Sequence, residues 1–215
     1  MDRRKALKNM GIAIGYSVAT PTLISLMQGC KSETTLEWAP EFFTQDEGAA
    51  LTKLVDIILP KTDTPSASEV QVHIFIDRFV DQVMEKKEQD FTKMSMAHFL
   101  EKAMTDSGKG KAGDLSSDDL EPVLAEALKV TKADEMKNLE AVQQYNEAMA
   151  EGKEASLDNA VSRFAFAKSL RDITIWGYKT SEYVGEQVLE YLPVPGEYIG
   201  CGDVNELTGG KAWSL

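Results

Sequence analysis

The side chains best suited to metal binding or nucleophilic chemistry are few in this sequence: His73, His98, Cys30 and Cys201. Neither histidine belongs to a set of cysteine, histidine and carboxylate side chains with the spacing of a zinc site. The sequence also lacks C-x-x-C-H, C-x-x-C, G-x-G-x-x-G and P-loop motifs. We therefore predict no catalytic residue, no cofactor site and no metal site in this chain, and we interpret His98 as structural.

The carboxylates offer little more. Asp63 lies between two threonines and would suit a catalytic acid, but a carboxylate in a turn is the simpler interpretation. The acidic pairs Asp118-Asp119 and Asp134-Glu135 lack the alternate spacing and the glycine of a calcium loop. They are typical of a solvated, charged face.

The N-terminus indicates export. Arg3 and Arg4 open a basic segment, and residues 10–29 are uncharged and moderately apolar. The arginine pair looks like a twin-arginine signal, which directs export of folded proteins. Gly29-Cys30 closes the apolar run and resembles a lipoprotein cleavage box, so we predict a lipid anchor on Cys30. A retained transmembrane helix is the alternative, which the glycines and the proline of the segment disfavour.

Charge excludes one class of partner. Residues 1–29 hold four of the 23 basic and one of the 35 acidic residues, which leaves 19 basic and 34 acidic residues, a formal charge of −15. Such a chain repels phosphate backbones and anionic lipid headgroups, so we predict no nucleic-acid binding.

Cysteine pairing stays open. If Cys30 is acylated, Cys201 is the single remaining thiol, and it is then either buried and inert or bridged to a second protein. If Cys30 is not acylated, a Cys30–Cys201 bridge becomes an alternative.

The first helix is expected between Thr44 and Pro60. Thr44 and Glu47 have capping-box spacing, and apolar residues then recur at helical spacing until Pro60. Residues 61–66 are typical of a turn-rich connector. Residues 70–83 fit a strand by alternation, but a longer helical stripe favours a helix. That stripe is Val72, Ile76, Phe79, Val80 and Val83.

Further helices are expected at 90–104, 119–130 and 156–176, with a solvated helix at 136–149 and a short one at 181–191. One face of the helix at 90–104 is expected to carry Phe91, Met94, Ala97, His98 and either Leu100 or Glu101. Ser156 is expected to cap the helix after it, which carries Phe164, Leu170, Ile173 and either Ile175 or Trp176. Gly177 marks a bend or a close contact.

These elements predict an all-α fold, a single irregular helical domain with a Pro/Gly-rich C-terminal extended segment. We expect a signal segment at 1–29, a tether at 30–43, the helical domain at 44–203 and a tail at 204–215.

Two regions carry a family resemblance. One is I-x-P-x-T-D-T-P at residues 58–65, followed by Phe75-Ile76-Asp77, and the other combines residues 176–182 with P-V-P-G-x-Y-x-G-C at 193–201. Together they resemble the gluconate 2-dehydrogenase subunit 3 family across roughly residues 40–203, although residues 105–155 match no pattern.

The resemblance implies a non-catalytic subunit that holds and co-exports a large FAD-dependent dehydrogenase subunit, with FAD in that partner and none in this chain. A cytochrome c subunit would receive the electrons, although the lipid box leaves its presence open. The expected location is the periplasmic side of a membrane. The candidate partner interface is Thr62, Asp63, Thr64, Pro65, Pro193, Pro195, Gly196, Tyr198 and Cys201, and Cys201 would suit an intersubunit disulfide.

Two other functions compete with this one. A stand-alone envelope lipoprotein would act as a ligand-binding or scaffold module. A small hydrolase would need a pocket of converging polar groups, with Asp63 as its acid.

Overall fold

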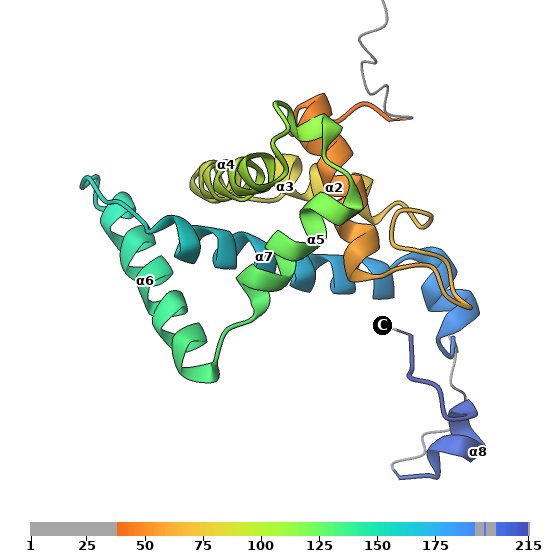
Figure 1. The fold of residues 1–215 in the computed structure, drawn as a ribbon. Coiled ribbons are helices and arrows are strands. Elements are labelled where there is room, and N and C mark those ends of the chain that lie inside the picture. The colour runs from red at the N-terminus through yellow and green to blue at the C-terminus, as the bar shows by residue number, and fades with distance from the viewer. Residues whose placement is uncertain (1–37, 192–195, 197–200, 215) are drawn as a thin grey trace, which may run out of the picture. The chain divides into compact units, whose positions relative to one another are not determined.

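The structure, a computed structural model, describes residues 38–191, 196 and 201–214. Within these residues the chain forms helices and no strand, which confirms the all-α prediction (Figure 1). The elements are α2 (Gln45–Ile58), α3 (Val72–Gln82), α4 (Lys86–Ser107), the 3-10 turn η1 (Ala112–Asp114), α5 (Ser117–Leu128), α6 (Lys132–Ala150), α7 (Asn159–Lys179), the π-helical turn η2 (Val184–Val188) and α8 (Val204–Thr208).

The start of α2 is the predicted capping box. Thr44 Oγ1 accepts from the Glu47 backbone amide at 3.3 Å, and Glu47 Oε2 accepts from the Thr44 amide at 2.8 Å. Glu47 also pairs with Lys93 of α4 at 2.6 Å. The same carboxylate therefore caps α2 and ties it to α4.

Residues 72–82 form a helix, as the longer apolar pattern predicts. Val72, Ile76 and Val80 are buried, but Phe79 is only half-buried and Val83 is 63% exposed. The predicted buried stripe is therefore wrong at its C-terminal end, because this end of α3 lines a surface groove instead of the core.

Asp77 of α3 fixes the segment that precedes α2. Its side chain is 1% exposed, and its Oδ2 atom accepts from the Glu41 amide at 2.7 Å. Its Oδ1 atom accepts from the Phe42 and Phe43 amides at 3.1 and 3.0 Å. Three backbone donors that no helix satisfies thus share one buried carboxylate, an arrangement that compensates its burial.

The core surrounds α7, which contacts α2, α3, α4, α5 and α6 (Figure 1). Phe99 and Met96 of α4, together with Leu51 and Leu54 of α2, are among its fully buried side chains. Phe166 of α7 packs against Phe99 with ring centroids 5.1 Å apart. α7 is therefore the element around which the other helices assemble.

Helix α4 differs from its prediction. It begins at Lys86 instead of Asp90, because Glu85 and Glu88 form a capping box that the pattern does not reveal. Its buried residues are Ser95, Met96, Phe99, Leu100 and Ala103, whereas Ala97 is exposed and Phe91, Met94 and His98 are half-buried. The predicted face was thus rotated toward α6, which covers α4 only partly.

The C-terminal helices also differ. Asp158, not Ser156, caps α7, since its Oδ1 atom accepts from the Ala160 amide at 2.8 Å. The predicted helix at 181–191 is reduced to the short π-helical turn η2. Ile175 and Trp176 are both exposed, whereas Thr174 and Gly177 on either side of them are buried.

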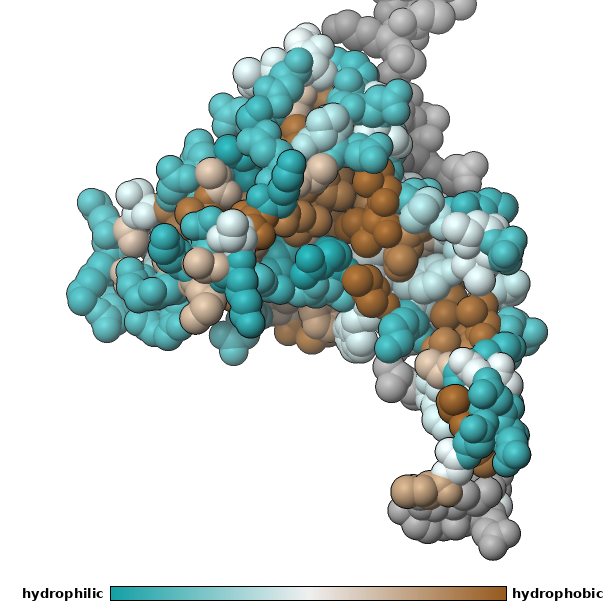
Figure 2. Space-filling model, turned by 60° about the horizontal axis from the view of Figure 1, so that its bottom comes forward, coloured by the Kyte–Doolittle hydropathy of each residue, from teal (hydrophilic) through white to brown (hydrophobic). Residues whose placement is uncertain are grey.

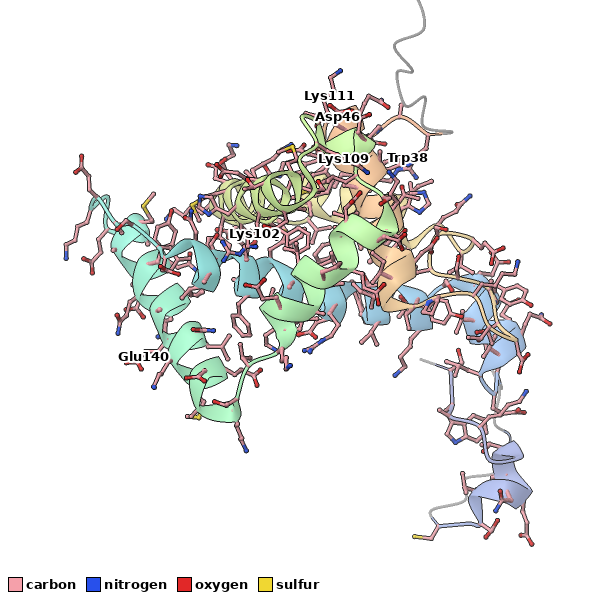
Figure 3. The ribbon with its side chains drawn as sticks, in the orientation of Figure 1. Trp38, Asp46, Lys102, Lys109, Lys111 and Glu140 are labelled. Atoms are coloured by element: carbon pink, nitrogen blue, oxygen red, sulfur yellow. The ribbon has the colours of Figure 1, made fainter. Side chains whose placement is uncertain are left out.

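Helix α6 has no buried residue, which agrees with the predicted solvated helix. Its Glu140 points away from the other helices (Figure 3). Tyr145 makes the main aromatic contact of α6, at 5.9 Å between its ring centroid and that of Phe91. No described helix is long and apolar enough to cross a membrane.

We expect Asp77→Ala to lower the free energy of unfolding by about 2–4 kcal/mol, because three backbone amides lose a charged acceptor. Asp81→Ala is the matched control: Asp81 lies one turn later on α3 and is exposed. Urea denaturation followed by circular dichroism measures both. If Asp77→Ala and Asp81→Ala lower the free energy of unfolding by the same small amount, the Asp77 hydrogen bonds do not stabilise the fold.

A second prediction concerns pH. Burial raises the pKa of Glu47, but the hydrogen bonds from Lys93 and Thr44 and the Lys93 charge outweigh it, so the pKa falls below its ordinary value of 4.5. A carboxylate whose pKa is lowered in the folded state stabilises the fold at pH values above its ordinary pKa. This stability is lost as the pH falls through the folded-state pKa. Glu47→Gln keeps the cap and removes the charge, so its stability should fall less on acidification than that of the wild type.

Glu88→Gln is the control for this measurement, because Glu88 has the same position in the α4 capping box but no ion-pair partner among the described residues. Unfolding free energies at a series of pH values above and below 4.5 give the comparison. An unchanged pH slope in Glu47→Gln would contradict the assignment.

Candidate functional site

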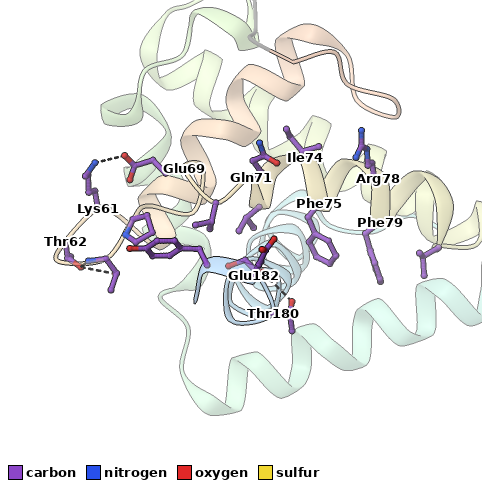
Figure 4. A pocket seen from close by; sticks show the side chains of 18 of the residues that line it. Lys61, Thr62, Glu69, Gln71, Ile74, Phe75, Arg78, Phe79, Thr180 and Glu182 are labelled. Atoms are coloured by element: carbon purple, nitrogen blue, oxygen red, sulfur yellow. Dashed lines mark hydrogen bonds and ion pairs between the residues drawn. The ribbon is translucent and has the colours of Figure 1, made fainter. Parts of the chain in front are cut away.

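A groove of about 1020 Å³ lies where the connector after α2, the helix α3 and the end of α7 meet (Figure 4). The connector contributes residues 61–65, and residues 180–183 follow α7. These two segments are more than 110 residues apart in sequence. The fold therefore brings residues 61–65 of the first family-like region beside residues 180–182 of the second.

Tyr178 ties the two sides of the groove. Its hydroxyl lies 2.8 Å from the Pro65 carbonyl oxygen, to which it donates, and 3.0 Å from the Thr64 hydroxyl. The connector is also anchored to α2, since the Ala67 amide donates to the Leu59 carbonyl at 3.0 Å. The extended segment thus keeps a fixed position beside α7.

Gly177 permits the close approach of α3 and α7. A Cβ atom at this position would lie 2.7 Å from Phe75 Cδ1 and 2.9 Å from Phe75 Cε1, closer than real Cβ contacts. α7 continues without a break to Lys179, so Gly177 marks a close contact and not a bend.

Three aromatic rings form a cluster at the edge of the groove. The ring centroids of Phe75 and Phe79 in α3 lie 5.2 and 5.6 Å from that of Trp176 in α7, and both pairs have edge-to-face geometry. Trp176 nevertheless remains 45% exposed, and Tyr183 beyond it is 51% exposed. Large apolar surface is therefore left facing solvent beside the groove.

The charges along the groove are unequally satisfied. Lys61 pairs with Glu69 at 2.5 Å, which raises the pKa of Lys61 and lowers that of Glu69 through their hydrogen bond. Arg78 pairs with Glu41 at 3.1 Å. Asp63 and Glu182 are exposed and have no ion-pair partner among the described residues.

The sequence matches the family described as Gluconate 2-dehydrogenase subunit 3 over residues 45–196 of its 215 residues. The chain belongs to the gluconate 2-dehydrogenase subunit 3 family. The matched region contains both sides of the groove. No curated protein and no solved structure matches the chain.

Four of the predicted interface residues of this gluconate 2-dehydrogenase subunit 3 family member, Thr62, Asp63, Thr64 and Pro65, line the groove. Gly196 is exposed with φ +71°, and Cys201 is exposed and forms no disulfide among the described residues. The other predicted site residues lie outside the described part of the chain: Arg3, Arg4, Cys30, Pro193, Pro195 and Tyr198.

The chain after η2 folds back on itself. The Glu190 amide donates to the Ala212 carbonyl at 2.9 Å, and the Ser214 amide donates to the Glu190 carbonyl at 2.8 Å. These two bonds hold Glu190 beside residues 212–214.

The aromatic edge of the groove was not predicted, because Phe79, Val83 and Trp176 fit helical stripes. No periodicity separates an apolar residue in the core from one at a surface groove.

Both histidines contact other side chains within the fold. His73 is buried against Trp38 with ring centroids 5.1 Å apart, and burial lowers its pKa although the charge of Asp56 opposes this. His98 Nδ1 lies 2.9 Å from the buried Ser162 hydroxyl. Within the described residues, no three His, Cys, Asp or Glu side chains are placed to hold a metal ion.

We expect Gly177→Ala to destabilise the fold by about 1–2 kcal/mol, because overpacking against Phe75 exceeds the gain in helix propensity. Phe75→Leu shortens the clashing side chain. The loss of unfolding free energy in the double variant should therefore be smaller than the sum of the losses in the two single variants. Gly110→Ala is the control, since its added Cβ meets open space. Additive effects in denaturant titrations would contradict the contact.

Proposed function

We propose that this chain is a non-catalytic small subunit that binds and co-exports the large FAD-dependent subunit of a gluconate 2-dehydrogenase-like complex on the periplasmic side of a membrane. Family membership supports a place in a dehydrogenase complex. The observation that carries the binding role is the concentration of exposed apolar side chains toward the C-terminus.

Seven of the eleven exposed large apolar side chains of the described residues lie between positions 175 and 213. They are Ile175, Trp176, Tyr183, Tyr191, Val204, Leu207 and Trp213. Figure 2 shows apolar surface interrupting the hydrophilic covering of the helices. Apolar surface gathered in one region is typical of a protein interface, whereas single exposed residues need no explanation.

In this proposal the helical core supports the interface, and the exposed residues of the groove bind the partner. The core around α7 and the Asp77 contacts hold a rigid support. The groove presents aromatic anchors on that support, which limits the entropy lost on binding. Catalysis and FAD then belong to the partner, and this chain supplies position and stability.

Export and anchoring follow from the N-terminus. A flavoprotein that folds around FAD before export needs a route for folded cargo, and the Arg3-Arg4 pair suits that route. A lipid on Cys30 would then tether the complex through residues 31–43. A cytochrome c subunit would complete electron transfer from the flavin.

The test is the location of the flavoprotein in the native host. Deleting this chain, or changing Arg3→Lys and Arg4→Lys together, should leave the flavoprotein inside the cell, measured by immunoblotting and flavin content of cell fractions. Cys30→Ser should instead release an exported, flavin-containing complex from the membrane fraction, because only the anchor is lost.

Lys5→Gln with Lys8→Gln is the matched control, since it removes two positive charges outside the arginine pair. The proposal requires normal flavoprotein export in this control. Normal export of active flavoprotein in the deletion strain would refute it.

A further inference from the structure

We propose that the groove between the connector 61–65, α3 and the end of α7 receives a segment of the partner subunit in which an arginine or lysine is flanked by apolar side chains. The inference rests on the proposed function for the identity of the partner, and on the charges and rings of the groove for the chemistry of the segment.

The first reason is unpaired negative charge. The cations that line the groove, Lys61 and Arg78, already have carboxylate partners within this chain. Asp63 and Glu182 line the same groove, are exposed and have no cationic partner among the described residues. A positively charged segment can therefore pair with these carboxylates on binding, whereas a negatively charged one finds no unpaired cation among the lining residues.

The second reason is the aromatic edge. Trp176 is 45% exposed beside Phe75 and Phe79, and Tyr183 lines the groove from the other segment. Aromatic faces attract guanidinium and ammonium groups, tryptophan most strongly, and they also bury apolar neighbours. One surface thus favours a cation and apolar side chains next to it.

The third reason is the charge of the adjoining chain. After residue 180 the sequence contains six acidic residues and one basic residue, Lys211. Long-range attraction therefore also favours a basic partner surface, and its contribution falls with salt. An anionic membrane is disfavoured by the same charge.

The probe is a set of short peptides with leucine on both sides of a central arginine, citrulline or glutamate. Citrulline keeps the shape of arginine without its charge. Tryptophan fluorescence of the purified full chain reports binding, and Trp176→Phe identifies the signal of the groove. We expect the arginine peptide to bind about tenfold more tightly than the citrulline peptide.

The double variant Asp63→Asn and Glu182→Gln should abolish this preference while keeping weak apolar binding. Its control is Glu101→Gln with Glu121→Gln, which removes two exposed charges that do not line the groove. Circular dichroism melting curves verify that both variants fold. An unchanged preference in the groove variant would overturn the inference.

Two other outcomes also overturn it: binding of none of the peptides up to about millimolar concentration, and a Trp176 signal with phosphatidylcholine or phosphatidylglycerol vesicles instead of peptides. The proposed function is tested separately. If the flavoprotein is exported only with this chain but the arginine and citrulline peptides bind equally well, the groove chemistry alone is refuted. If the arginine peptide binds selectively but deleting this chain leaves flavoprotein export unchanged, the proposed function alone is refuted.

Discussion

The close approach of α3 and α7 at Gly177 is the contact on which the surface of this protein depends. Because residue 177 has no side chain, the Phe75 ring lies directly against the backbone of α7. That position brings Phe79 and Trp176 into one cluster and places Tyr178 within reach of Pro65. One missing methyl group therefore determines both the depth of the groove and the position of its wall.

A second constraint lies at Asp77, a buried residue near the middle of α3. Asp77 holds the backbone of residues 41–43 through three hydrogen bonds, directly before α2 begins. The segment that leads from the N-terminal region is thereby fixed to the same helix that forms the groove.

Two kinds of side chain bear on the proposed role of this protein. Asp77 and Ser162, two of its buried polar side chains, are bonded to groups within the fold. The exposed aromatic residues, by contrast, have solvent where a partner would bury them. Free energy gained by covering Trp176 and Tyr183 would favour the assembled complex, while the exposed carboxylates would select the partner's charge.

The sequence alone determined the all-α fold, the cap of α2 and the solvated character of α6, because these features depend on local spacing and on residues within one helical turn. It also indicated the family, through the motifs at residues 58–65 and 176–182. Only the tertiary structure decided which apolar residues are buried. Val80 and Val83 fit the same stripe, yet one packs in the core and the other lines the groove, since the end of α3 passes beyond its neighbours. The start of α4 and the cap of α7 were missed although both caps are local contacts. Glu85 is not a favoured N-cap residue, and Ser156 and Asp158 are both suited to cap α7, so spacing alone did not identify either cap.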